Sequence, residues 1–173
     1  MRRLTAIMAL GTLLAMFGGV ATASPAFAGR GHKWQFVPAQ PFTLPAIFCG
    51  FKIRVSFPVN KEYAKVLKTS DGSVTTLTTG ALKASFTNLN TGKTITENLS
   101  GPAKVTVSAN GTLTFRQKGH TGFTLLPAIA KRFGLPTAAV VAGSLTTVVA
   151  PNGRTRSMTL HGHVLVNICK ALS

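Results

Sequence analysis

Two histidines near the C-terminus have the spacing of a metal-binding pair. His161 and His163 are separated by one glycine, so in an extended strand both imidazoles project from the same face. His120 could supply a third nitrogen, and three histidines without a carboxylate suit Zn or Cu. The alternative is two solvent-exposed histidines on the polar face of the last strand, because Leu160 and Val164 alternate with them. We favour this alternative and expect no bound metal or other cofactor.

Acidic side chains, which most hydrolases use as acids, bases or nucleophiles, are scarce. The chain holds only Glu62, Asp71 and Glu97. Asp71 stands in an Asp-Gly turn, and Glu62 lies among lysines, so both are expected at the surface. Glu97 shares strand parity with Ile95 and Leu99, and on an apolar face a carboxyl group is held in its neutral, proton-donating form. Glu97 is the one candidate general acid. The alternative, which we favour, is that a bulge or strand end lets it reach water or a lysine.

Basic residues dominate the charge of the chain. There are 19 Lys and Arg against 3 Asp and Glu, which gives a formal net charge of +16. Five of the basic residues fall on the polar positions of expected strands: Lys52, Arg54, Lys83, Lys104 and Arg116. If those strands are neighbours, one face of the sheet is positive and attracts polyanions. The alternative is that the charge only keeps the protein soluble. Most aromatic residues fall at inward positions, so we expect no stacking platform for single-stranded nucleic acid.

The elements that must carry these residues are short strands separated by turns. Residues 51–59 alternate between apolar and polar side chains, and Pro58 is expected to end this strand at a sheet edge. Further strands are expected at 63–69, 82–87, 95–99, 105–107, 113–115, 145–149 and 157–168, with turns at 71–72, 90–92, 110–111 and 151–153. This pattern predicts an all-β fold, an antiparallel meander that closes as a sandwich or a barrel.

One stretch has helical spacing instead. Leu126, Ile129, Ala130 and Phe133 occupy positions i, i+3, i+4 and i+7. A proline opens the segment and Gly134 follows it, as is typical of the first turn and the C-terminal cap of a helix. The spacing predicts one short helix near 127–133.

The first 28 residues have the organisation of a cleavable export signal. A basic start, Met1-Arg2-Arg3, precedes an apolar run and a small-residue segment that ends in Ala26-Phe27-Ala28. The apolar run is short and is followed by Pro25, which argues against a membrane anchor. Cleavage after Ala28 removes two arginines and leaves a secreted chain, residues 29–173, with a formal net charge of +14 and no membrane span.

The mature chain is expected to begin with a proline-rich, irregular arm at 29–48, followed by a single β domain at 49–173. The arm holds four aromatic residues, Trp34, Phe36, Phe42 and Phe48. Large apolar side chains are usually buried, so we expect the arm to lie against the core.

Cys49 and Cys169 are the only cysteines, and an even number in an exported chain predicts a disulfide. A loop of this length could gain about 4–5 kcal/mol from closure. Cys169 falls on the polar parity of the last strand, whereas its partner falls on the apolar parity of the first. A bulge near Gly162 or Asn167, or a disulfide at the sheet rim, is therefore needed to bring them together.

Several segments resemble small secreted proteins of actinobacteria whose activity is uncharacterised. The matching residues are Phe48-Cys49-Gly50-Phe51, Asn88-Leu89-Asn90-Thr91-Gly92-Lys93 and Val166-Asn167-Ile168-Cys169-Lys170-Ala171-Leu172. These motifs are structural, two half-cystines and a hairpin. The resemblance implies export, a disulfide and a β fold, and it carries no catalytic residue.

These observations favour a secreted, monomeric protein without enzymatic activity. Its expected partners are anionic polymers of the cell envelope or extracellular matrix, bound by the basic sheet face. Two alternatives remain open. One is a β-barrel that holds a small ligand in its interior. The other is a small hydrolase or metal-binding protein that uses Glu97 or the pair His161 and His163.

Overall fold

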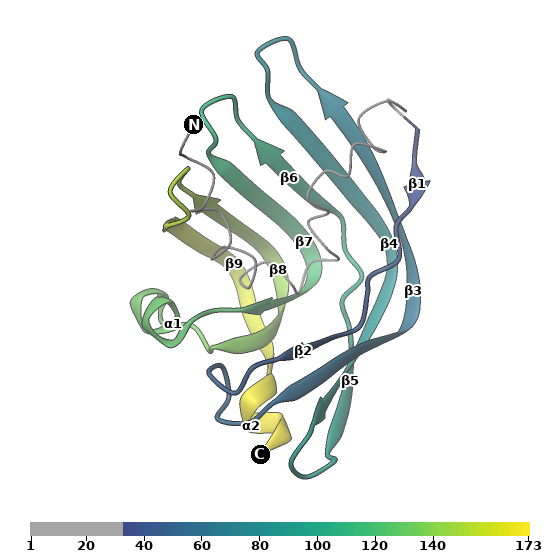
Figure 1. Ribbon diagram of the computed structural model, residues 1–173, viewed down its shortest axis with the longest axis vertical. Coiled ribbons are helices and arrows are strands. Elements are labelled where there is room, and N and C mark those ends of the chain that lie inside the picture. Colours follow the sequence, from purple (N-terminus) through teal and green to yellow (C-terminus); the bar gives the residue numbers. More distant parts are fainter. Residues whose placement is uncertain (1–32) are drawn as a thin grey trace, which may run out of the picture.

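The computed structural model describes residues 33–173, so the expected signal peptide at 1–28 lies outside the described residues. Within these residues, nine strands form a single antiparallel sheet, accompanied by two short helices (Figure 1). The all-β class is confirmed, and the helix expected near 127–133 is α1, Pro127–Phe133. The sheet is open, so it forms neither a closed barrel nor the two separate sheets of a sandwich.

The strands follow one another along the chain with few crossovers. They are β1 (Gln35–Phe36), β2 (Phe42–Leu44), β3 (Ile53–Lys68), β4 (Val74–Asn88), β5 (Thr94–Asn98), β6 (Ala103–Val107), β7 (Leu113–Thr124), β8 (Ala138–Val149) and β9 (Thr155–Asn167). The order across the sheet is β1-β3-β4-β6-β7-β8-β9, while β2 pairs with β3 and β5 pairs with β4. The last element is helix α2 (Ile168–Leu172), which follows β9 directly.

The first long strand does not end at Pro58, as the sequence predicts. β3 continues to Lys68, and its register with β4 shifts between Ser56 and Val59. A bulge leaves residues outside the ladder, so a proline is tolerated there without the loss of a ladder hydrogen bond. The two strands expected at 51–59 and 63–69 are therefore one.

The short strands β5 and β6 lie along β4 as one interrupted strand. Lys83 of β4 pairs with Asn98 of β5, and Thr78 pairs with Ala103 of β6. Counting three residues from the pair of Lys83 and Asn98 toward the break places Gly80 opposite Gly101. Counting two residues from the pair of Thr78 and Ala103 toward the break gives the same match. The register is thus continuous across the break between β5 and β6.

A row of glycines crosses the sheet at this level. Gly101 lies opposite Gly119 of β7, because the amide of Lys118 donates to the carbonyl of Pro102 at 3.0 Å, next to them. Gly119 pairs with Gly143 of β8, and Gly143 pairs with Gly162 of β9. We call the row formed by Gly80, Gly101, Gly119, Gly143 and Gly162 the glycine crease. Sequence analysis did not detect it.

The glycine crease is a place where side chains do not fit. Four of its members have positive φ angles, +144° at Gly80, +84° at Gly119, +123° at Gly143 and +154° at Gly162, in a region that L-residues rarely adopt. A Cβ at Gly143 would overlap the carbonyl oxygen of His161, and one at Gly162 would overlap that of Ala142. The strands can therefore bend here, and Figure 1 shows them curving at mid-length.

The main core lies at the end of the sheet where the strands separate into two groups. Beyond the glycine crease, β4 pairs with β5, whereas β7 continues beside β8. Helix α2 contacts members of both groups, namely β4, β5, β8 and β9. Its Ile168 and Leu172 are fully buried beside Phe86 of β4 and Val140 of β8. Burial of such side chains stabilises the fold by about 1.5–3 kcal/mol each.

A second cluster packs under α1. Ala130 of this helix is buried with Phe123, Val141 and Leu145. β8 is therefore covered on two sides, because Val141 faces this cluster while Val140 belongs to the main core. α1 ends at Gly134, whose φ of +64° gives the left-handed cap that the sequence predicts.

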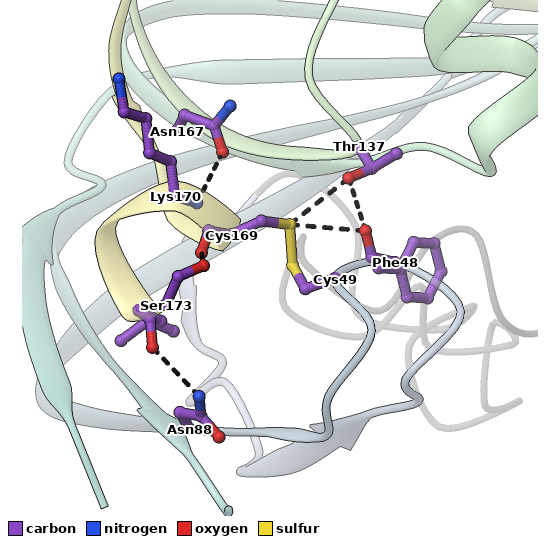
Figure 2. The surroundings of a disulfide bond; sticks show 9 residues. Phe48, Cys49, Asn88, Thr137, Asn167, Cys169, Lys170 and Ser173 are labelled. Carbon is purple, nitrogen blue, oxygen red and sulfur yellow. Dashed lines mark hydrogen bonds between the residues drawn. A yellow bond between two sulfur atoms is a disulfide. The ribbon is translucent and has the colours of Figure 1, made fainter. Parts of the chain in front are cut away.

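The disulfide between Cys49 and Cys169 is confirmed, and it joins the loop after β2 to helix α2 (Figure 2). The parity conflict disappears because Cys169 lies on a helix rather than on the last strand. Thr137 donates to the carbonyl of Phe48 beside the bridge. Asn88 of β4 donates to the carbonyl of Leu172 at 3.0 Å and fixes the end of the same helix. The disulfide thus ties the two groups of strands together.

The arm before the first cysteine contacts the core only in part. Phe48 is buried and Phe42 packs against the main core, as expected. Trp34 and Phe36, in contrast, are exposed, so the expectation for them is wrong. The reason is that β1 pairs with the outer edge of β3, with Phe36 opposite Tyr63, away from the core.

We predict that Gly143→Ala lowers the free energy of unfolding by about 3 kcal/mol or more, because the new methyl group overlaps a neighbouring carbonyl and the φ angle is strained. Gly92→Ala is the matched control: its φ of +77° is also strained, but a Cβ there meets open space, so a loss of only about 1 kcal/mol is expected. Urea unfolding of both variants measures the difference. Equal losses would contradict a steric role for the crease.

We predict that replacing both cysteines with serine lowers the free energy of unfolding by about 4 kcal/mol, because the open chain gains conformational entropy when unfolded. Reduction of the wild-type protein with dithiothreitol serves as the control. It should lower the midpoint of urea unfolding by as much as the double substitution does. A reduced protein as stable as the oxidised one would show that α2 and the main core hold the two groups of strands without the bridge.

Candidate anion-binding face

The register of the sheet aligns three cations on neighbouring strands. Directly paired residues of antiparallel strands point to the same face. Lys104 of β6 pairs with Arg116 of β7 and, on its other side, with Leu77 of β4. Leu77 pairs in turn with Lys65 of β3. Lys65, Lys104 and Arg116 thus form one cationic row, interrupted by a single leucine.

Two other predicted residues lie on this face but farther along the strands. Lys83 is six residues from Leu77 on β4, about 20 Å along the strand, and shares its parity. Arg54 pairs with Thr87 of the same strand, about 33 Å from Leu77 by the same measure. Lys52 precedes β3 and is exposed. The structure therefore brings Lys104 and Arg116 together and leaves the other three apart from them.

Further basic residues that the sequence analysis did not select join the same face. Lys118 follows Arg116 by two residues, and its partner Ser144 pairs with His161. His120 pairs with Ala142, which pairs with His163. Alternation along each strand gives all of them the same parity in the sheet. We call this set of side chains the basic face: Arg54, Lys61, Lys65, Lys83, Lys104, Arg116, Lys118, His120, His161 and His163.

The three carboxylates lie away from the basic face. Asp71 is in the turn between β3 and β4, where it accepts a hydrogen bond from the amide of Ser73 at 2.9 Å. Hydrogen bonds from Thr69 and Ser73 lower its pKa. Glu62 and Glu97 have the opposite parity, since Glu97 pairs with the buried Ala84. No acidic residue of the described chain therefore neutralises the face locally.

The closest approach of two cations is the pair Lys104 and Arg116. Both are exposed, and together with Thr106 and Thr114 they line a shallow hollow. Like charges placed directly opposite each other on antiparallel strands destabilise a sheet. An anion in this hollow would offset the repulsion and find two hydroxyl groups beside the cations. The arrangement is suited to binding a phosphate or carboxylate group.

The three histidines of the described chain, His120, His161 and His163, lie on β7 and β9. Among residues 33–173, no group of three His, Cys, Asp or Glu side chains is arranged to hold a metal ion. His120 and His163 are separated by the strand of Ala142, about 10 Å from backbone to backbone. His161 and His163 are exposed on β9.

The carboxylates do not form a catalytic pair. Glu62 lies opposite Gly80 on one side of β4, and Glu97 lies opposite Ala84 on the other. These two contact points are about 13 Å apart along β4 alone, beyond the roughly 5–10 Å that separates glycosidase carboxylates. Glu97 is half-buried beside Ile95 and Leu99, the parity that the sequence predicts, without a second acid in reach.

The surroundings of Glu62 shift its pKa in the direction opposite to that of Asp71. Burial at the end of the glycine crease raises its pKa above 4.5. The folded state therefore favours the protonated form, and the stability that this contributes is lost as the pH rises through the raised pKa.

We predict that Glu62→Gln becomes increasingly stabilising relative to wild type as the pH rises from 4 to 7, because glutamine carries no charge to bury. Urea unfolding of both proteins at intervals across this range measures the difference in stability. A difference that stays constant with pH would show that burial does not penalise the ionised Glu62.

Comparison with known proteins adds no relative from which a function could be transferred. No protein-family model, curated protein or solved structure matches this chain. In the described part, neither helix has the length and apolar character needed to cross a membrane.

Proposed function

We propose that this is a secreted protein without enzymatic activity that binds anionic polymers of the cell envelope or extracellular matrix through its basic face. The observation that carries the proposal is the pairing of Lys104 with Arg116 on an exposed sheet surface, where their repulsion is not offset by a nearby acid. The disulfide between the two groups of strands supports an oxidising location outside the cell.

The form of the face supports a polymer rather than a compact ligand. Its cations extend from Lys65 to Arg116 across the strands, and Lys118 follows Arg116 along β7. An extended polyanion can contact several such groups at once, and its condensed counterions are released on binding. The open sheet encloses no barrel interior, so a small ligand held inside a barrel gains no support.

We predict that Lys104→Ser combined with Arg116→Ser weakens binding to polyphosphate and reduces the slope of log affinity against log salt by about two, one for each lost contact. The free energy of unfolding should not fall, because the substitution also removes a like-charge pair. Titration calorimetry across a salt series, with urea unfolding in parallel, measures both effects.

The control variant carries Lys131→Ser and Lys170→Ser, which remove the same charge from exposed positions on α1 and α2. It should keep most of the affinity of wild type. Pull-down by purified cell wall, with and without its teichoic acid, tests the expected source of the anion. Equal weakening by both variants would indicate attraction by net charge alone, and no binding by wild type would overturn the proposal.

A further inference from the structure

Three aromatic side chains are exposed together at the edge formed by β1 and β3. Trp34, Phe36 and Tyr63 keep 48%, 55% and 43% of their surface exposed. Phe36 pairs with Tyr63, and their ring centroids lie 5.7 Å apart. Continuing this register by one residue puts Trp34 opposite Lys65. We call these three aromatic residues the aromatic edge. Side chains of this size are usually buried, so their joint exposure marks an interaction surface.

The aromatic edge is continuous with the basic face. Tyr63 pairs with Thr79, which shares the parity of Leu77 and Lys83 on β4. Along β3, Tyr63 lies between Lys61 and Lys65, both of which point to the same side. A ligand that contacts the aromatic rings can therefore also reach the cations on the same side of β3.

One row of residues connects the aromatic edge to the opposite edge of the sheet. From Phe36 on β1 it passes through Tyr63 and Thr79, crosses the break between β5 and β6, and continues through Lys118, Ser144 and His161. Seven strands are crossed, which corresponds to about 29 Å at the usual strand spacing. Beside it runs the row of Lys65, Leu77, Lys104, Arg116, Thr146 and Thr159. Aromatic, hydroxyl and cationic groups thus succeed one another along a single track.

We infer that the polymer is an acidic polysaccharide and that its sugar rings stack on the aromatic edge; this inference rests on the proposed function. A pyranose ring has an apolar face of C–H groups, and covering an exposed aromatic ring with it removes apolar surface from water. Its hydroxyl groups find partners in Thr79, Ser144 and Thr146. Its carboxylate or phosphate groups find Lys104 and Arg116, where charge-assisted hydrogen bonds are strongest.

Single-stranded nucleic acid fits the same surface less well. Nonspecific binders of single strands place aromatic side chains along the track, so that successive bases can stack between the phosphate contacts. Here the aromatic rings gather at one edge, and the rest of the track carries hydroxyl groups and cations. Polysaccharides match this order, because they carry many hydroxyl groups and because not every sugar ring needs an aromatic partner.

The test compares two anionic polymers, one with sugar rings and one without. Polygalacturonate oligomers and polyphosphate of similar charge are titrated into wild type and into the combined variant Trp34→Ala, Phe36→Ala, Tyr63→Ala. We expect the variant to bind polygalacturonate about tenfold more weakly, the equivalent of about 1.4 kcal/mol, and to bind polyphosphate as wild type does. Unchanged polyphosphate binding also shows that the variant is folded.

Two further variants make the result specific. Trp34→Ala alone removes a ring from the aromatic edge without disturbing the pair of Phe36 and Tyr63. It should weaken polygalacturonate binding by less than the triple substitution does. Ile47→Ala with Leu89→Ala removes apolar side chains that are 57% and 40% exposed outside the face, and should leave both affinities unchanged.

The remaining outcomes show which proposal fails, anion binding by the basic face or sugar stacking on the aromatic edge. In one outcome, the Lys104 and Arg116 variant loses polyphosphate binding while the aromatic substitutions leave polygalacturonate binding unchanged. The basic face is then still an anion site, and the sugar-stacking inference is overturned. Equal weakening of both polymers by the aromatic substitutions overturns it as well. Tighter, ring-dependent binding of oligodeoxythymidylate would assign the surface to nucleic acid instead. Failure of wild type to bind either anionic polymer overturns the proposed function itself.

Discussion

The rest of the structure depends on the close approach of backbones at the glycine crease. Four strands and the link between β5 and β6 lack a side chain at the same level, and at Gly80, Gly101, Gly143 and Gly162 a Cβ would overlap a neighbouring carbonyl oxygen. A sheet that bends here can curve over its own apolar side chains, so a single open sheet builds a core without a second sheet. Beyond the crease its strands separate into two groups, and α2 fills the space between them. The disulfide then fixes that helix to the loop after β2.

Alternation of apolar and polar residues predicted most strands, and the two cysteines of an expected exported chain predicted the disulfide, but neither pattern predicted the crease. Within one strand, an isolated glycine such as Gly119 or Gly143 is typical of a bulge or a turn. Only the register between strands shows that these glycines are aligned, and register is a property of long-range pairing. For the same reason Pro58 was expected to end a strand, although a bulge accommodates it. Helix α2 is too short for helical periodicity to be distinguished from the end of a strand.

Parity alone predicted the direction of the basic side chains but not their neighbours. Lys104 and Arg116 are adjacent because β6 continues the register of β5 along β4 and then pairs with β7. Lys83 and Arg54 have the same parity yet lie far along the strands, beyond the glycine crease. The aromatic edge was not expected, because Trp34 lies in a proline-rich arm that offers no alternation from which to predict exposure. Its position follows from the pairing of β1 with the outer edge of β3.

The placement of cations on strands rather than on loops determines what kind of ligand the face can recognise. Strand backbones hold side chains at regular intervals, about 4.8 Å across the sheet and about 6.7 Å between residues of one face along a strand. The backbone positions of Lys65, Lys104 and Arg116 are therefore set before a ligand arrives, and only their side chains have to be ordered on binding. Such a lattice suits a chain whose charges repeat at fixed spacing, since each repeat can meet the next cation. Because the carboxylates lie elsewhere, the attraction acts over the whole face, while the aromatic edge adds a contact that charge alone does not provide.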